Sequence, residues 1–171
     1  PVEWGVRRMK PSRKDPRHRA REATLQILYQ WEVAKTDVSG AADTFFDLQW
    51  ADAEAPSDEF RAFATELAHD TVRRLAEADL LIAEKAERWR PERMAVLDRL
   101  ILRMAVTERL RTLRPARAGR PLGRDELAPP AVVINEALEL ARTFSTEEAV
   151  KFINGMLDAI RKTLEAGDEG R

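Results

Sequence analysis

The residues best suited to chemistry in this sequence are the cationic side chains near its start. Residues 1–21 contain eight arginines and lysines and only two acids, which gives a net charge of +6. The eight are Arg7, Arg8, Lys10, Arg13, Lys14, Arg17, Arg19 and Arg21. Guanidinium groups donate paired hydrogen bonds to phosphate and stack on unpaired bases. The segment therefore predicts attraction to a polyanion such as nucleic acid; a solvated tail without a ligand is the alternative.

The charge of the rest of the chain has the opposite sign. The 150 residues after Arg21 hold 21 cations and 28 acids, a net charge of −7, while the whole chain carries −1. The total charge therefore hides a basic arm attached to an acidic body.

Few residues of this chain are suited to catalysis or to metal binding. Cysteine is absent, which excludes disulfides, thiolate metal sites and a cysteine nucleophile, and His18 and His69 are the only histidines. We expect no enzyme activity, no cofactor and no metal. The sequence shows no apolar run of membrane-spanning length and no apolar signal segment, so we expect a cytoplasmic protein.

The elements that must position these residues are predicted to be helices. Apolar residues recur at helical spacing, and no segment shows the alternation of a strand. We predict an all-α bundle of about seven helices: a flexible basic arm over residues 1–16, a single helical domain over 17–165 and a flexible tail over 166–171. Breaks are expected at Ser39–Gly40, near residue 77, at Trp89–Pro91 and over the basic, proline-rich loop 114–130.

Two serines are predicted to begin helices. The hydroxyl of Ser57 can accept a hydrogen bond from a free backbone N–H of the helix that follows. Ser145-Thr146-Glu147-Glu148 has the pattern of a capping box, in which Ser145 and Glu148 bond each other's backbone N–H groups.

Three blocks of this sequence resemble the NusB family of transcription antitermination factors. The first is Arg19-Ala20-Arg21-Glu22-Ala23 with Gln26, Leu28-Tyr29 and Trp31, and the second is Asp98-Arg99 with Leu102-Arg103-Met104-Ala105. The third runs from Val133-Ile134-Asn135-Glu136-Ala137 to Phe144 and on to Lys151-Phe152-Ile153-Asn154-Gly155-Met156-Leu157-Asp158. The order and spacing of the blocks agree with the family over roughly residues 17–165.

The resemblance implies a fold, a function and partners. The fold is two perpendicular three-helix bundles. The function is not enzymatic: such proteins bind single-stranded boxA RNA together with NusE, a ribosomal protein. The resulting antitermination complex lets RNA polymerase read through terminators, notably in ribosomal RNA operons.

The resemblance also implies which residues bind RNA. Arg17, Arg19 and Arg21 match the arginine-rich start of the family, and Lys151 and Phe152 match its RNA-proximal turn. Glu148 lies where an acidic residue could accept a hydrogen bond from a base edge, although capping explains it equally well. Phe152 also falls on the apolar stripe of the last helix, so a core role stays open, and Gly155 is expected to admit a closely packed helix.

Five further residues fall near positions that the family uses for NusE: Tyr29, Glu92, Asp98, Arg99 and Arg103. Each could instead be an ordinary surface residue or part of a helix pair. The sequence departs from the family in its long, basic 114–130 loop and in residues 1–8, which precede a plausible family start at Met9-Lys10-Pro11.

Two other hypotheses compete with RNA-directed antitermination. One is a helical protein-binding module or a homodimer, without specific RNA readout. The other is an RNA-modifying enzyme, because a similar helical domain precedes the catalytic domain of some RNA methyltransferases. We do not expect the enzyme, since the sequence lacks the glycine-rich α/β pattern of such a domain.

Overall fold

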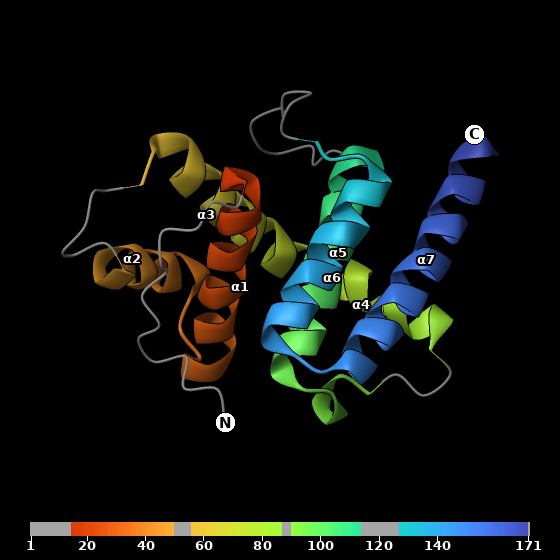
Figure 1. Ribbon diagram of the computed structural model, residues 1–171, viewed down its shortest axis with the longest axis horizontal. Helices are drawn as coiled ribbons and strands as arrows, with labels where there is room; N and C mark the ends of the chain where they lie inside the picture. Colours follow the sequence, from red (N-terminus) through yellow and green to blue (C-terminus); the bar gives the residue numbers. More distant parts are fainter. Residues whose placement is uncertain (1–14, 50–55, 87–89, 114–126, 171) are drawn as a thin grey trace. The chain divides into compact units, whose positions relative to one another are not determined.

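The computed structural model describes residues 15–49, 56–86, 90–113 and 127–170, and these ranges contain only helices (Figure 1). The seven α-helices are α1 (Pro16–Ala34), α2 (Val38–Gln49), α3 (Asp58–Arg73), α4 (Leu75–Lys85), α5 (Val96–Leu113), α6 (Pro130–Phe144) and α7 (Glu147–Glu169). A short 3-10 helix, η2 (Pro91–Arg93), precedes α5. The prediction of an all-α fold is confirmed. The basic residues before Asp15, Trp89, and the arginines of 114–126 lie outside the described ranges.

The chain divides into two compact units, the first ending at Val72 and the second beginning at Arg73. In the first unit, α1 packs against α2, and α1 also meets α3 through the buried Thr24. The hydroxyl of Thr24 lies 2.9 Å from the carbonyl oxygen of Ala20 and 3.2 Å from that of Ala64. Because small residues surround this contact, the two helix backbones can approach closely there.

The start and end of α1 follow local sequence signals. Pro16 occupies the first turn, where the N–H that proline lacks would have no helical partner. Asp15 caps the helix by accepting a hydrogen bond from the N–H of Arg17 at 3.0 Å. Lys35 ends the helix in the left-handed region, with φ of 55°. Asp15 and Pro16, which the sequence analysis placed in the arm, thus belong to the helix start.

The predicted break at Ser39–Gly40 is wrong. Both residues lie in the first turn of α2, and Asp37 starts that helix by accepting a hydrogen bond from the N–H of Gly40 at 2.8 Å. The break lies at residues 35–37 instead, because Lys35 already ends α1. The predicted cap at Ser57 is confirmed, since its hydroxyl accepts from the N–H of Phe60 at 3.2 Å. The break expected near residue 77 lies at Arg74, between α3 and α4.

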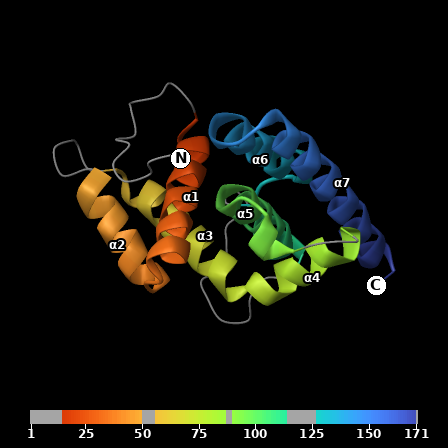
Figure 2. The same cartoon turned by 90° about the horizontal axis from the view of Figure 1, so that it is seen from below.

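The second unit is built around α5. Helices α4, α6 and α7 all contact it (Figure 2). Every residue from Arg99 to Arg111 is buried, polar residues included. A helix that is covered on several sides needs no outward polar face, so α5 does not show the single apolar stripe of a surface helix.

The junction between α6 and α7 differs from the predicted capping box. Thr146, not Ser145, caps α7, and it accepts a hydrogen bond from the N–H of Ala149 at 3.1 Å. Ser145 ends α6 instead: its N–H donates to the carbonyl of Ala141, and its hydroxyl donates to Asp98 of α5. Because the hydroxyl of Ser145 is bonded to Asp98, 47 positions earlier in the chain, it is not available to cap α7. The helix α7 continues to Glu169, through most of the segment assigned to the tail.

Candidate nucleic-acid interface

Three of the predicted RNA-binding arginines lie on the first two turns of α1. Arg17 and Arg19 are half-buried, whereas Arg21 is only 6% exposed. All three guanidinium groups lie over phenylalanine rings of α3. The carbon Cζ of Arg17 is 4.6 Å from the centroid of the Phe63 ring, and that of Arg21 is 5.3 Å from the same centroid. Arg19 lies over Phe60 at 5.9 Å.

Phe60 and Phe63 are residues that sequence reasoning missed as part of a site. Their spacing of three is that of the apolar face of a helix, so the sequence alone gives no reason to assign them any role beyond the core. Nothing local in the sequence joins residues 60–63 to residues 17–21. The contact arises because the Thr24–Ala64 hydrogen bond sets the register of α1 against α3.

His18 has a structural place among these arginines. It is 4% exposed, and its Nε2 lies 2.9 Å from Oε1 of Glu22, one turn further along α1. Its burial against Glu22 gives this ring a structural contact within α1.

A second candidate surface lies on the first half of α7. Glu148, Lys151 and Phe152 are all exposed, and Phe152 retains 42% of its surface. The core role that the sequence left open for Phe152 is therefore excluded; Ala149, Ile153 and Met156 form the buried face. The stripe is narrower than the sequence suggested, because residue 152 lies on its edge.

Gly155 lies one turn beyond Phe152 and is also exposed. A Cβ built at this position would meet nothing within 4 Å. The expectation that Gly155 admits a closely packed helix is therefore wrong. The result is a stretch of bare helix backbone beside an exposed aromatic ring.

The five predicted partner-binding residues fall into two groups. Tyr29 is half-buried on α1, and Glu92 is exposed on η2. The other three make contacts within the second unit. Asp98 accepts the hydrogen bond of Ser145; Arg99 donates to the carbonyl of Pro91 at 2.6 Å; Arg103 binds both carboxylate oxygens of Asp79, at 2.8 and 2.9 Å.

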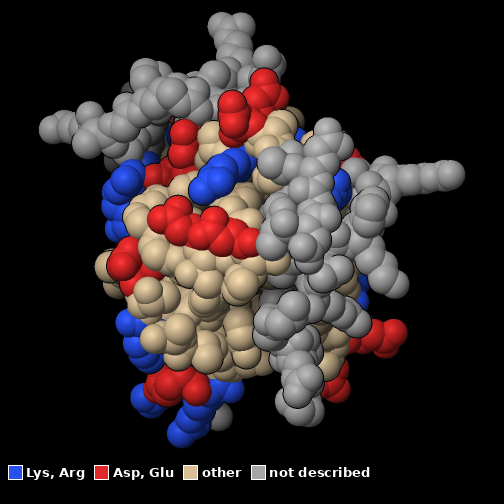
Figure 3. Space-filling view, turned by 90° about the vertical axis from the view of Figure 1, so that its left-hand side faces the viewer, with Lys and Arg blue, Asp and Glu red and all other residues tan. Residues whose placement is uncertain are grey.

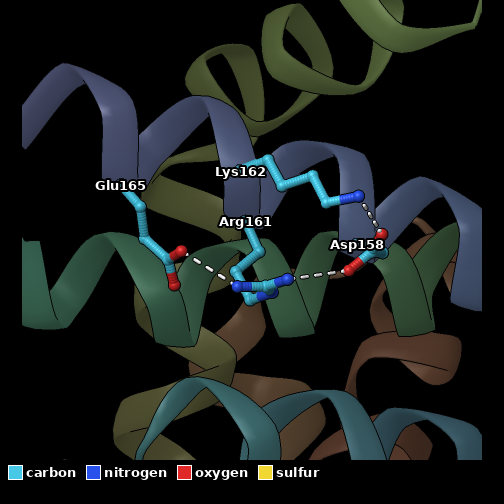
Figure 4. A network of polar contacts seen from close by, with 4 residues as sticks. All are labelled: Asp158, Arg161, Lys162 and Glu165. Atoms are coloured by element: carbon cyan, nitrogen blue, oxygen red, sulfur yellow. Dashed lines mark hydrogen bonds and ion pairs between the residues drawn. The ribbon is translucent and has the colours of Figure 1, made fainter.

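The second half of α7 carries a balanced network of charges (Figure 4). Arg161 binds Asp158 at 3.0 Å and Glu165 at 2.9 Å, and Lys162 binds Asp158 at 3.0 Å. Hydrogen bonds from Lys162 and Arg161 hold the pKa of the Asp158 carboxyl below its ordinary value. Two acids and two cations balance within this network, and Asp168 and Glu169 follow it in the same helix, so the second half of α7 offers no excess of positive charge to a polyanion.

One face of the molecule illustrates how the remaining charges are distributed. Figure 3 shows acidic and basic side chains together on this face, among uncharged residues. A surface of mixed sign does not steer a polyanion over long distances. On this face, attraction to RNA would therefore depend on particular side chains at short range.

Two other kinds of site were sought among the described residues. Within these ranges, no three histidine, aspartate or glutamate side chains gather as ligands of a metal ion. None of the helices drawn there has both the length and the apolar character to cross a lipid bilayer.

Comparison with known proteins adds sequence and fold relatives. The sequence model of the NusB family matches residues 18–118 and 125–162. The transcription antitermination protein NusB of Solibacter usitatus is 43% identical over 148 residues, covering 86% of this chain and 90% of that protein. A solved structure of T. maritima NusB has a TM-score of 0.69 at 29% identity, over 87% of this chain and 92% of that one.

A further solved structure shares the fold. It contains antitermination factors NusB and NusE in complex with double-stranded RNA, and its matched chain has a TM-score of 0.67 at 23% identity. The match covers 86% of this chain and 97% of that one.

Proposed function

This chain belongs to the NusB family of transcription antitermination proteins, and we propose that it binds single-stranded boxA-type RNA together with NusE. The bound complex joins RNA polymerase in the cytoplasm and promotes read-through of terminators, notably in ribosomal RNA operons. The chain itself breaks no bond in this function; it holds the transcript and its protein partner.

The observation that carries the RNA part of the proposal is the exposed face of α7. Phe152 leaves 42% of its surface uncovered beside the exposed Lys151, and Gly155 leaves backbone bare one turn away. Stacking of a base on an aromatic side chain contributes about 1–3 kcal/mol in single-strand binding proteins. An unpaired base can stack on Phe152 while Lys151 contacts a phosphate.

The remaining predicted RNA-binding residues are assigned roles by their chemistry. Glu148 is exposed, and since Thr146 performs the capping, its carboxylate remains available to accept from a base amino group. Arg17 and Arg19 contact phosphates through the edges of their guanidinium groups. Arg21 is more deeply buried and supports its neighbours.

The NusE part of the proposal divides the five partner residues by exposure. Tyr29 and Glu92 contact NusE directly. Arg99 acts through η2, because its hydrogen bond to Pro91 holds the short helix that carries Glu92. Asp98 holds the end of α6 against α5, and Arg103 holds the middle of α4 against α5.

The test is a titration of boxA-containing RNA and of a scrambled RNA of the same composition, each with and without NusE. We expect tighter binding of the boxA RNA, and a further gain when NusE is present. Equal affinity for both RNAs under both conditions would refute sequence-directed binding. Phe152→Ala in the intact protein is expected to weaken RNA binding. Leu80→Ala is its control, because Leu80 is also an exposed apolar residue but lies on α4.

A protein-binding module or homodimer is the second candidate function. It is favoured by exposed apolar side chains at Val33, Leu48 and Leu80. Sedimentation over a range of concentrations distinguishes the two functions. Self-association at micromolar concentration, together with RNA affinity that is unchanged when residues 1–14 are deleted, would support the second.

A further inference from the structure

The first two turns of α1 and of α3 meet in a fixed register. The hydrogen bond from Thr24 to the carbonyl of Ala64 joins the two helices where both have buried small residues. Upstream of this point, α1 carries its three arginines and α3 carries Phe60 and Phe63. The arginines therefore come to lie over the aromatic rings, near the N-terminal end of α1.

We propose that Phe60 and Phe63 are positioning residues for RNA binding: the two rings hold the guanidinium groups of Arg17 and Arg19 in the orientation that receives phosphate, and Phe63 also packs against the buried Arg21. This inference rests on the proposed function. A guanidinium stacked by one flat face keeps the N–H donors at its edge free to form paired hydrogen bonds. An arginine that is already held loses less conformational freedom when the transcript arrives.

The contact of Arg19 with the Phe60 ring illustrates this positioning. Its Nε is buried and finds no acceptor among the described residues. The Phe60 ring lies 5.9 Å from its Cζ. Phe60 is itself held at the start of α3, because its N–H donates to the hydroxyl of Ser57 at 3.2 Å.

Phe63 contacts two of these cations. The Cζ atoms of Arg17 and Arg21 lie 4.6 and 5.3 Å from the same ring centroid. Arg17 is half-buried, whereas Arg21 is buried, so Arg17 is the one of the two that a phosphate can reach.

The same unit contains a matched control for this proposal. Arg61 lies over the Phe46 ring at 4.8 Å and also pairs with Asp43 at 3.7 Å. This second arginine–phenylalanine pair joins α3 to α2 and includes none of the proposed RNA-binding residues. Loss of its ring tests what a general loosening of the first unit does to RNA binding.

The experiment compares four substitutions in the full chain: Phe60→Leu, Phe60→Tyr, Phe63→Leu and Phe46→Leu. Binding is measured with boxA-containing RNA, and thermal unfolding is followed in parallel. Phe60→Leu and Phe63→Leu are each expected to weaken binding about threefold to tenfold. Phe60→Tyr keeps an aromatic face and retains binding, and Phe46→Leu leaves the affinity unchanged. Phe60 is half-exposed, so its variants remain informative if Phe63→Leu fails to fold.

A double-mutant cycle separates positioning from a merely structural role. If Phe63 acts through Arg17, then Phe63→Leu weakens binding much less in an Arg17→Gln background than in the wild type. Arginine side-chain NMR spectra of free protein give a second readout, because removal of a ring shifts the resonances of the guanidinium above it.

The outcomes distinguish this proposal from the proposed function. A wild-type chain that binds no RNA refutes the function and this inference together. A wild-type chain that binds boxA RNA, with Phe60→Leu and Phe63→Leu as tight as wild type, overturns the inference alone. Additive effects in the cycle, or an equal loss in Phe46→Leu, would also overturn it.

Discussion

The guanidinium of Arg103 shows how a single side chain can differ from its sequence-based assignment. The family resemblance places it near NusE, but it binds Asp79 through two nitrogens. The side chain of Arg103 is 7% exposed and that of Asp79 is 28% exposed. Such a pair fixes the orientation of α4 on α5, and removing one partner leaves a poorly solvated charge. The 24 residues between the partners explain why sequence spacing did not reveal the pair.

Asp158 gives a prediction about acid stability. Its pKa is lowered from the ordinary 3.8, chiefly by the hydrogen bond from Lys162 and then by that from Arg161. A carboxyl with a depressed pKa in the folded state contributes stability above its unfolded pKa and loses it as the pH falls through its folded pKa. We therefore expect Asp158→Asn to flatten the loss of stability below pH 3.8.

Urea unfolding at neutral pH and between pH 2 and pH 4 would measure this effect. Glu139→Gln is the control, because it breaks a comparable exposed pair with Arg142 on α6. An acid limb that is identical in Asp158→Asn and in wild type would contradict the prediction.

At the scale of an element, α7 combines a firmly packed face with an exposed one. Ile153, Met156 and Ile160 are buried, while Phe152 and Gly155 are not. The sequence predicted this helix correctly, because its apolar period is unbroken. It did not predict the width of the buried face, since that depends on how closely α5 and α6 pack around α7.

Gly155→Ala is the prediction that belongs to α7. A glycine in an exposed helix interior costs about 1 kcal/mol relative to alanine, and here a methyl group meets nothing within 4 Å. We expect the variant to be more stable by about 0.5–1 kcal/mol. If a base lies over this backbone, the same variant binds boxA RNA more weakly.

Gly167→Ala is the matched control, because Gly167 lies in the same helix and is equally open. It should stabilise α7 without any change in RNA affinity. Chemical denaturation measures the stability of both variants, and RNA titration measures their affinity. Equal RNA affinity in the two variants would show that the transcript does not reach Gly155.

At the scale of the whole molecule, the sequence predicts features that depend on local spacing, but not those that depend on contacts between distant residues. Helical periodicity led to the correct fold class, because it depends only on local spacing. The burial of α5 on all sides, the stacking of arginines on Phe60 and Phe63, and the exchange of caps at Ser145 all depend on residues far apart in the sequence. The charge asymmetry between residues 1–21 and the rest of the chain is visible in the sequence alone.

The prediction at this scale concerns salt. If the basic residues contact phosphates, the logarithm of the RNA affinity falls linearly with the logarithm of salt concentration, with a slope of about −0.7 for each single-strand contact. Deletion of residues 1–14 leaves the three arginines of α1 and should make the slope less steep. Fluorescence titrations between low and physiological salt measure it, and a flat response in the wild type would rule out the phosphate contacts.

The central place of α5 has a consequence for protease digestion. The helix carries four arginines, Arg99, Arg103, Arg109 and Arg111, and each is a site at which trypsin could cut. All four are buried, so the enzyme reaches them only when the surrounding helices separate. Resistance of this arginine-rich stretch to trypsin would thus report directly on how often the second unit opens.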